Sequence, residues 1–151
     1  AMIDAEAVAS QQTARAAEFI RRELRQASRT TIEVASPAEL RYARVEDANS
    51  DGLAFSLAAP ELGPPCRLLL DVGDMNADGI TNQFLLFQGD RSTVIASGIF
   101  ASAAPGETAA PPVFSIESSG RVVVEFESHE QSRLGSTVRR TIREEVFPRN
   151  P

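Results

Sequence analysis

The chain has 151 residues, of which 42% are hydrophobic and 24% are charged, a composition typical of one folded globular domain and unlike that of a disordered chain. Its formal net charge of -6 disfavours nucleic-acid backbones and anionic membrane surfaces, so no specific nucleic acid is expected as a partner. The sequence has no apolar run of about 18 residues that could span a bilayer. The single cysteine, Cys66, excludes an intramolecular disulfide framework.

The first 30 residues have the pattern of a helix. Residues 3–29 contain no glycine or proline and are rich in good helix formers. Small or apolar side chains recur there at steps of three and four residues. The stripe consists of Ala9, Thr13, Ala16, Ile20, Leu24 and Ala27. We therefore predict a helical stalk over residues 3–29, about 40 Å long. Its C-terminal half packs on the core, and its small, polar first half projects towards neighbouring helices.

Strand patterns dominate the rest of the chain, with turn signals between them. The expected strands are 31–35, 40–46, 53–58, 67–72, 82–88, 93–100, 113–117, 121–128 and 137–147. Residues 101–112 carry three prolines and no large apolar side chain, which predicts a mobile loop. The fold class that follows is α+β, with a long N-terminal helix packed on an antiparallel β-sheet. Residues 1–151 form one domain, whose β-rich head is 31–147.

The residues that common enzymes need are largely missing. His129 is the only histidine, and its polar surroundings, "ESHEQS", are typical of an exposed turn. The chain has no G-x-S-x-G, no Gly-rich loop followed by lysine and no H-E-x-x-H. It has no tryptophan, and Tyr42 is its only tyrosine, so a platform for stacking sugars is poorly supplied. We predict that the protein is not an enzyme and has no small-molecule substrate.

The stretch "LLLDVGDMNADGITNQFLLF", residues 68–87, matches the first half of a calcium-binding loop. Asp74, Asn76 and Asp78 occupy the positions whose side-chain oxygens face the ion, and Gly79 occupies the turn position. Ile80 would donate its carbonyl oxygen. Asn82 would stand at the ninth position.

The match to a calcium loop then ends. Leu85 stands where a bidentate glutamate would complete the coordination sphere, and strands rather than helices flank the loop, so this is not an EF-hand. A Ca²⁺ site between two strands could recruit Asp71 or Asp90 as a further ligand. Asp, Asn and Gly are also what a tight connection between strands selects, so a purely polar turn is the alternative.

A dense charged group lies near the C-terminus. Arg139, Arg140 and Arg143 are followed directly by Glu144 and Glu145. Alternation along a strand would place these charges on a solvated face. The other interpretation is an ion-pair site for a neighbouring subunit.

Three segments resemble the type IV pilin-like family, in particular PilW-like minor pilins and minor pseudopilins. "AAEFIRRELRQASR" is similar to the end of the family's helix, with its F-x-x-x-x-L-R-x-A pattern. "LLLDVGDMNADGITNQFLLFQGD" is similar to a strand, acidic turn and strand that follow. "VRRTIREEVFPRN" resembles the closing strand, which often ends in a pair such as Arg149-Asn150.

The resemblance implies a pilin-like fold and a structural role without catalysis. Such a subunit would help to prime or cap a type IV pilus or a type II secretion filament, with other minor pilins or pseudopilins and the major pilin as partners. It would be anchored in the inner membrane by a hydrophobic half-helix upstream of Ile3, with its head in the periplasm or on the cell surface. Ala1-Met2 would then be an expression remnant. The alternative is a secreted calcium-binding adhesion or carbohydrate-binding β-domain.

Overall fold

The computed structural model describes residues 5–46, 55–56, 59–101, 112–131 and 134–148. The chain begins with helix α1 (Ala5–Gln26) and a 3₁₀ turn, η1 (Arg29–Thr31). The strands are β1 (Glu33–Ser36), β2 (Glu39–Val45), β3 (Phe55–Ser56), β4 (Ala59–Pro60), β5 (Leu62–Asp71), β6 (Gln83–Gln88), β7 (Arg91–Ser97), β8 (Ile99–Phe100), β9 (Phe114–Ile116), β10 (Val122–Gln131) and β11 (Thr137–Val146).

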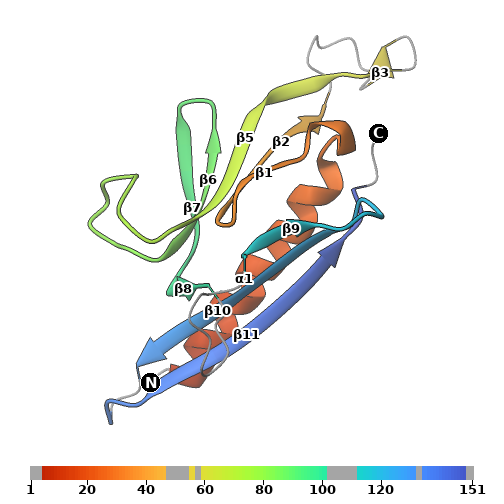
Figure 1. Ribbon diagram of the computed structural model, residues 1–151. Coiled ribbons are helices and arrows are strands. Elements are labelled where there is room, and N and C mark those ends of the chain that lie inside the picture. The colour runs from red at the N-terminus through yellow and green to blue at the C-terminus, as the bar shows by residue number, and fades with distance from the viewer. Residues whose placement is uncertain (1–4, 47–54, 57–58, 102–111, 132–133, 149–151) are drawn as a thin grey trace.

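The strands form two main sheets (Figure 1). The first has five strands in the order β1-β2-β5-β6-β7. The second has four, in which β10 pairs with β11 on one side and with β8 and β9 on the other. Among the described strands, β3 and β4 pair with each other and form a separate two-stranded sheet. All described pairs are antiparallel, as the turn-separated strands predicted.

The prediction of a long helix packed on one sheet is wrong. The described residues are mostly antiparallel strands in two main sheets, and the one α-helix among them has 22 residues. The helix ends at Gln26, before the predicted residue 29, because the next residues form tertiary contacts with strand β2. Ala27 forms a β-bridge with Arg44, and the Ser28 amide donates to the Ala43 carbonyl across 2.8 Å. No helix in the described residues has the length and apolar character needed to cross a membrane.

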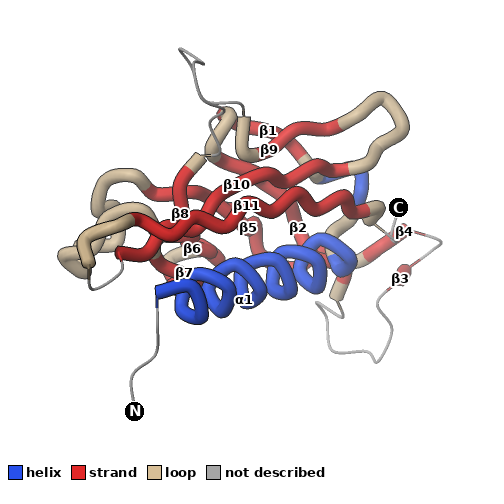
Figure 2. The backbone as a smooth tube through the Cα atoms, turned by 90° about the horizontal axis from the view of Figure 1, so that it is seen from below, coloured by secondary structure: helices blue, strands red, loops and turns tan. Residues whose placement is uncertain are grey.

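The expectation of a projecting first half of the helix is also wrong for the side chains described. Gln12 accepts a hydrogen bond from the Ser97 amide of β7 through its Oε1, over 3.1 Å. The hydroxyl groups of Thr13 and Ser128 of β10 are hydrogen-bonded. These contacts attach the helix to both sheets from Gln12 onwards. Figure 2 shows α1 running alongside β10 and β11.

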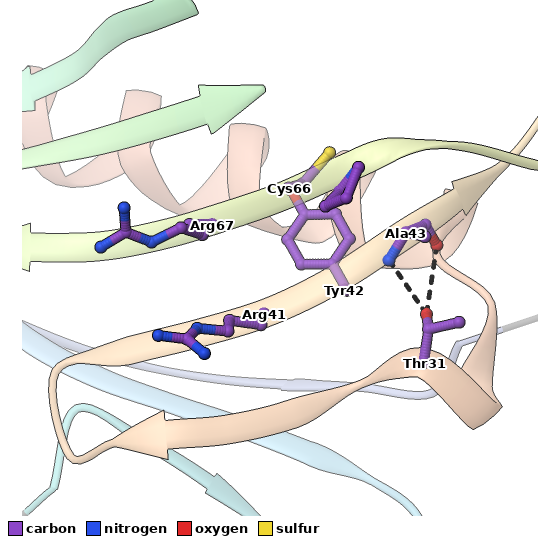
Figure 3. A pocket seen from close by; sticks show the side chains of 7 residues that line it. Thr31, Arg41, Tyr42, Ala43, Cys66 and Arg67 are labelled. Carbon is purple, nitrogen blue, oxygen red and sulfur yellow. Dashed lines mark hydrogen bonds between the residues drawn. The ribbon is translucent and has the colours of Figure 1, made fainter. Parts of the chain in front are cut away.

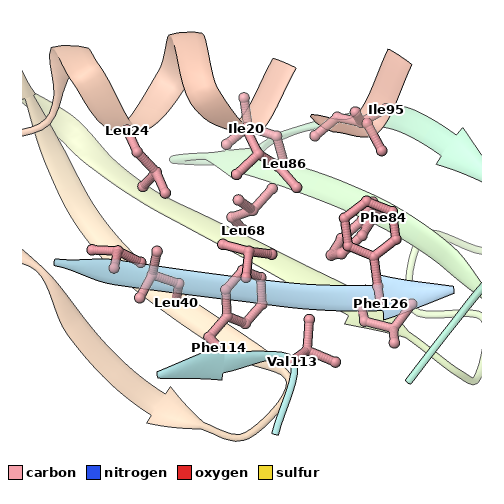
Figure 4. Close-up of a cluster of buried hydrophobic side chains, with 14 of the residues drawn as sticks. Ile20, Leu24, Leu40, Leu68, Phe84, Leu86, Ile95, Val113, Phe114 and Phe126 are labelled. Carbon is pink, nitrogen blue, oxygen red and sulfur yellow. The ribbon is translucent and has the colours of Figure 1, made fainter. Parts of the chain in front are cut away.

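One hydrophobic core joins the helix to the two sheets (Figure 4). The apolar stripe of α1 supplies Ile20 and Leu24, both with no exposed surface. Phe84 of β6 meets Phe126 of β10 edge to face, with ring centroids 4.9 Å apart, so aromatic packing links the two sheets. The core residues from the strands include Leu40, Leu68, Leu86, Ile95, Ile99, Phe114, Val122 and Val124.

The expected strand 93–100 is two strands, because Gly98 separates β7 from β8. Its φ of +69° is a conformation that side-chain-bearing residues rarely adopt. A Cβ at this position would lie 2.8 Å from the His129 carbonyl oxygen. Gly98 thus allows β8 to leave the first sheet and pair with β10. Much of the expected strand 53–58 and of the loop 101–112 lies outside the described residues.

Candidate functional site

The acidic loop between β5 and β6 is held by its own side chains. Asp74 accepts the amide of Asp78 at Oδ1 (3.0 Å) and the amide of Gly79 at Oδ2 (2.9 Å). Asp78 in turn accepts the amide of Ile80 at Oδ1, across 2.9 Å. These bonds follow from aspartate's tendency to bond backbone groups a few residues ahead. Left-handed backbone at Ala77 (φ 56°) and Gly79 (φ 83°) turns the chain.

The same contacts favour the charged form of Asp78. The Ile80 amide is the main cause that holds the pKa of Asp78 below its usual value. Asn76 adds a second donor, since its Nδ2 lies 3.2 Å from Asp78 Oδ2. The buried Oδ1 of Asn76 has no hydrogen-bond partner among the described residues. Asp74, Asn76 and Asp78 are therefore brought together, as their spacing predicted.

The other predicted ligands do not join this group. Asp71 is 3% exposed, and its carboxylate accepts the amides of Gly73 (3.2 Å) and Met75 (2.8 Å). The Asn82 carbonyl accepts the Ile99 amide, so this residue supports β8. Within the described ranges, no three histidine, cysteine or acidic side chains converge on a common point. Any Ca²⁺ at this loop would therefore rest on Asp74, Asn76 and Asp78, with the Ile80 carbonyl as a further candidate, and calcium binding stays a prediction.

His129 lies in strand β10, not in the exposed turn that its neighbours suggested. Its ring stacks on Phe100 of β8, with centroids 4.1 Å apart and planes 14° from parallel. Its Nε2 lies 2.8 Å from Glu127 Oε2 on the same strand. Stacking and the carboxylate hold the imidazole in one orientation, and the stacking adds to the contact between β8 and β10.

The most buried ionic contact of the described chain was not anticipated. Glu23, 5% exposed, lies on α1 and accepts the Tyr42 hydroxyl at 2.8 Å. Arg44 donates to the same oxygen, Oε1, from Nε at 2.5 Å. Burial, and then the Glu23 carboxylate, raise the pKa of Tyr42 above its usual value. Burial also raises the pKa of the Cys66 thiol, which lies opposite Tyr42 in the sheet.

One sequence signal pointed to this cluster. Glu23 lies between Ile20 and Leu24 on the apolar side of the helix, and a charged residue there needs a partner. The identity of the partner depends on how β2 crosses the helix. The sequence does not give this crossing, because Tyr42 and Arg44 lie 19 and 21 positions after Glu23.

A shallow depression of about 390 Å³ lies over β2 and β5 (Figure 3). At one end, Thr31 accepts the Ala43 amide at Oγ1 across 2.9 Å. At the other, Arg41 and Arg67 extend side by side, away from Thr31. Glu39 bridges them, with 2.7 Å to Arg41 Nε and 2.7 Å to Arg67 Nη2, and the contact with Arg67 is the main cause that lowers the pKa of Glu39.

Comparisons with protein-family models, with curated proteins and with solved structures found no match for this chain.

Proposed function

We propose that the protein is a minor pilin or pseudopilin, a non-catalytic structural subunit that helps to prime or cap a type IV pilus or a type II secretion filament. The observation that carries the proposal is the segment resembling the family's F-x-x-x-x-L-R-x-A helix end. Its apolar members do the packing: Leu24 and Ala27 are fully buried, and Phe19 is packed against the core. Arg25 is exposed. The segment therefore anchors α1 to the β strands.

The open side of α1 supports a role in assembly. Arg15, Glu18, Arg22 and Arg25 are exposed along it, opposite the stripe that enters the core. Glu18 and Arg22 pair at 2.9 Å, which leaves two arginines of this side to meet an acidic neighbour. On a protein of net charge -6, such a basic side favours contact with another acidic subunit. In the proposed setting the native protein is held in the inner membrane by an upstream half-helix, with its head outside that membrane.

The two-sheet architecture favours a second candidate, a secreted calcium-binding adhesion or carbohydrate-binding β-domain. The acidic loop would be its binding end, since Val72, Met75 and Ile80 are exposed there (68%, 58% and 49%) beside the aspartates. Exposed apolar side chains within a polar loop are typical of recognition surfaces.

A gene deletion in the source bacterium separates the two candidates. A filament subunit predicts loss of surface filaments or of type II secretion, restored by the wild-type gene. A secreted β-domain predicts intact filaments and secretion, with the protein in the culture medium. The native gene gives a cheaper check, since the first candidate requires about 20 apolar residues upstream of Ile3.

A further inference from the structure

Strand β11 forms an edge of the four-stranded sheet. Among the described strands, β10 is its one neighbour, and the two pair over ten consecutive residues. Figure 1 shows β11 along the outer margin of the molecule. An edge of this length directs half of its backbone donors and acceptors outwards, where another strand can add to the sheet.

Helix α1 packs against the inner face of this sheet, on both β10 and β11. Thr13 bonds to Ser128 on β10, one strand in from the edge. Arg21 reaches Glu144, a residue of β11 whose side chain points to the inner face, at 2.6 Å. Residues of the opposite face of β11 are exposed, and the inner-face residues Val138 and Ile142 are half-buried. A partner strand could therefore approach β11 in the plane of the sheet.

Symmetry restricts how a second copy can use this edge. Suppose that two β11 strands pair antiparallel about a two-fold axis perpendicular to the sheet. Residues that face each other have their side chains on the same face of the sheet, so their positions differ by an even number. The residue midway between them then lies at the axis and faces its own copy. An axis at Thr141 places Arg139 opposite Arg143, and an axis at Arg143 places that arginine opposite itself. Both registers oppose like charges, which destabilises a strand pair.

An axis at Ile142 gives the opposite result. Arg139 then faces Glu145 on the outer face, and Arg140 faces Glu144 on the inner face. The two-fold axis repeats each pair, so four arginine–glutamate pairs flank the axis. They add to the ion pairs that Glu144 forms with Arg21, and Glu145 with Arg121, within each chain. Opposite charges on facing residues stabilise antiparallel strands.

The apolar residues agree with the same register. The two Ile142 side chains meet at the axis, on the inner face and next to the core that Ile142 already contacts. Val138 faces Val146 of the other copy. Phe147, which is 53% exposed directly after the strand, comes to lie opposite Thr137. The register therefore covers apolar surface that the single chain leaves open.

We propose that two copies of this chain pair antiparallel through β11 about Ile142, joining their four-stranded sheets into one continuous sheet. The partner is a second copy because the order of charges along β11 is complementary to itself. The proposal rests on the fold and the sequence of β11 and holds whichever candidate function is correct.

Sedimentation over micromolar to millimolar concentrations tests the pairing. The wild type is expected to dimerise, and R139E to raise the dimer dissociation constant about tenfold, because two carboxylates would then face each other on both sides of the axis. E145R weakens the dimer likewise. A mixture of R139E with E145R regains wild-type affinity, because the residues that face each other at positions 139 and 145 are again opposite in charge. R15E, the same charge change on the exposed side of α1, leaves the constant unchanged. A monomer at millimolar concentration, or no recovery in the mixture, overturns the proposal.

Cross-linking tests the register without relying on charge. In I142C the facing Cα atoms lie about 4.5–5.5 Å apart, within the range of a disulfide. In T141C the two cysteines are displaced along the strands, beyond about 7 Å. Mild oxidation is expected to link I142C into a dimer and to leave T141C and the wild type as single chains. Equal linking of both variants, or of neither, contradicts the register.

Discussion

The phenol oxygen of Tyr42 lies 2.8 Å from a carboxylate oxygen of Glu23 and joins strand β2 to helix α1. Arg44 of β2 shares the same oxygen, so one buried carboxylate serves two donors. The contact fixes how the helix lies on the first sheet, and the consequences of removing it can be measured.

Glu23→Ala is expected to lower the free energy of unfolding by about 2–4 kcal/mol, because it leaves two buried or half-buried donors without their acceptor. Denaturant unfolding measures the change. Glu18→Ala on the same helix is the matched control. Glu18 is 69% exposed in its ion pair with Arg22, so its loss should change stability by less than about 0.5 kcal/mol. Equal effects of the two substitutions would show that the buried contact is not important.

Stability should fall at alkaline pH through Tyr42. Burial and Glu23 raise the pKa of this phenol above the ordinary 10.0, so the folded state holds the proton more tightly than the unfolded state. The stabilisation is complete below pH 10 and is lost as the pH rises beyond it. Unfolding midpoints measured across this range should decline for the wild type. Tyr42→Phe should decline less steeply, since it has no phenol to ionise, and parallel curves would contradict this assignment.

Cys66 should be inert in the folded protein. The thiol is 1% exposed and its pKa is raised by burial, so little of the reactive thiolate is present at neutral pH. A thiol reagent is expected to react with one equivalent only after denaturant unfolds the chain. Rapid reaction under native conditions would mean that the β2–β5 region opens readily.

The strands were largely predictable because alternation and turn residues are local signals. Val122, Val124 and Phe126 alternate with Val123, Glu125 and Glu127 and lie in strand β10, where a strand was expected. The end of the helix was not predictable, since Ala27 and Ser28 suit a helix but are drawn into contacts with Arg44 and Ala43. The arrangement of two sheets depended on such distant contacts too. A break as short as Gly98 redirects a strand from one sheet to the other.

The candidate site was predictable in the same local sense. Asp74, Asn76 and Asp78 are close in sequence and meet in space. Asp71 was expected to join them, but its carboxylate instead accepts hydrogen bonds from the backbone amides of Gly73 and Met75. Backbone amides satisfy an aspartate as readily as a metal ion does, and the sequence cannot rank the two.

Calcium binding at this loop can be tested by thermal melting. A bound ion should raise the melting temperature of the wild type in millimolar Ca²⁺, because it binds the folded loop alone, and Asp78→Ala should remove the rise. Glu33→Ala is the control, an exposed acidic residue of strand β1 that is not among the candidate ligands. If Ca²⁺ changes neither the wild type nor Asp78→Ala, the loop is a self-bonded polar turn.

Cross-linking in the cells that produce the native protein tests most directly whether the protein is a filament subunit. A photoreactive residue placed at Arg22, on the exposed side of α1, should form adducts with other pilins or pseudopilins. Ser118, in the exposed turn before β10, serves as a comparison position for surface exposure alone. A filament subunit is expected to give adducts from position 22 that contain other filament subunits. Recovery of the protein from the culture medium, with no such adduct from either position, would contradict it.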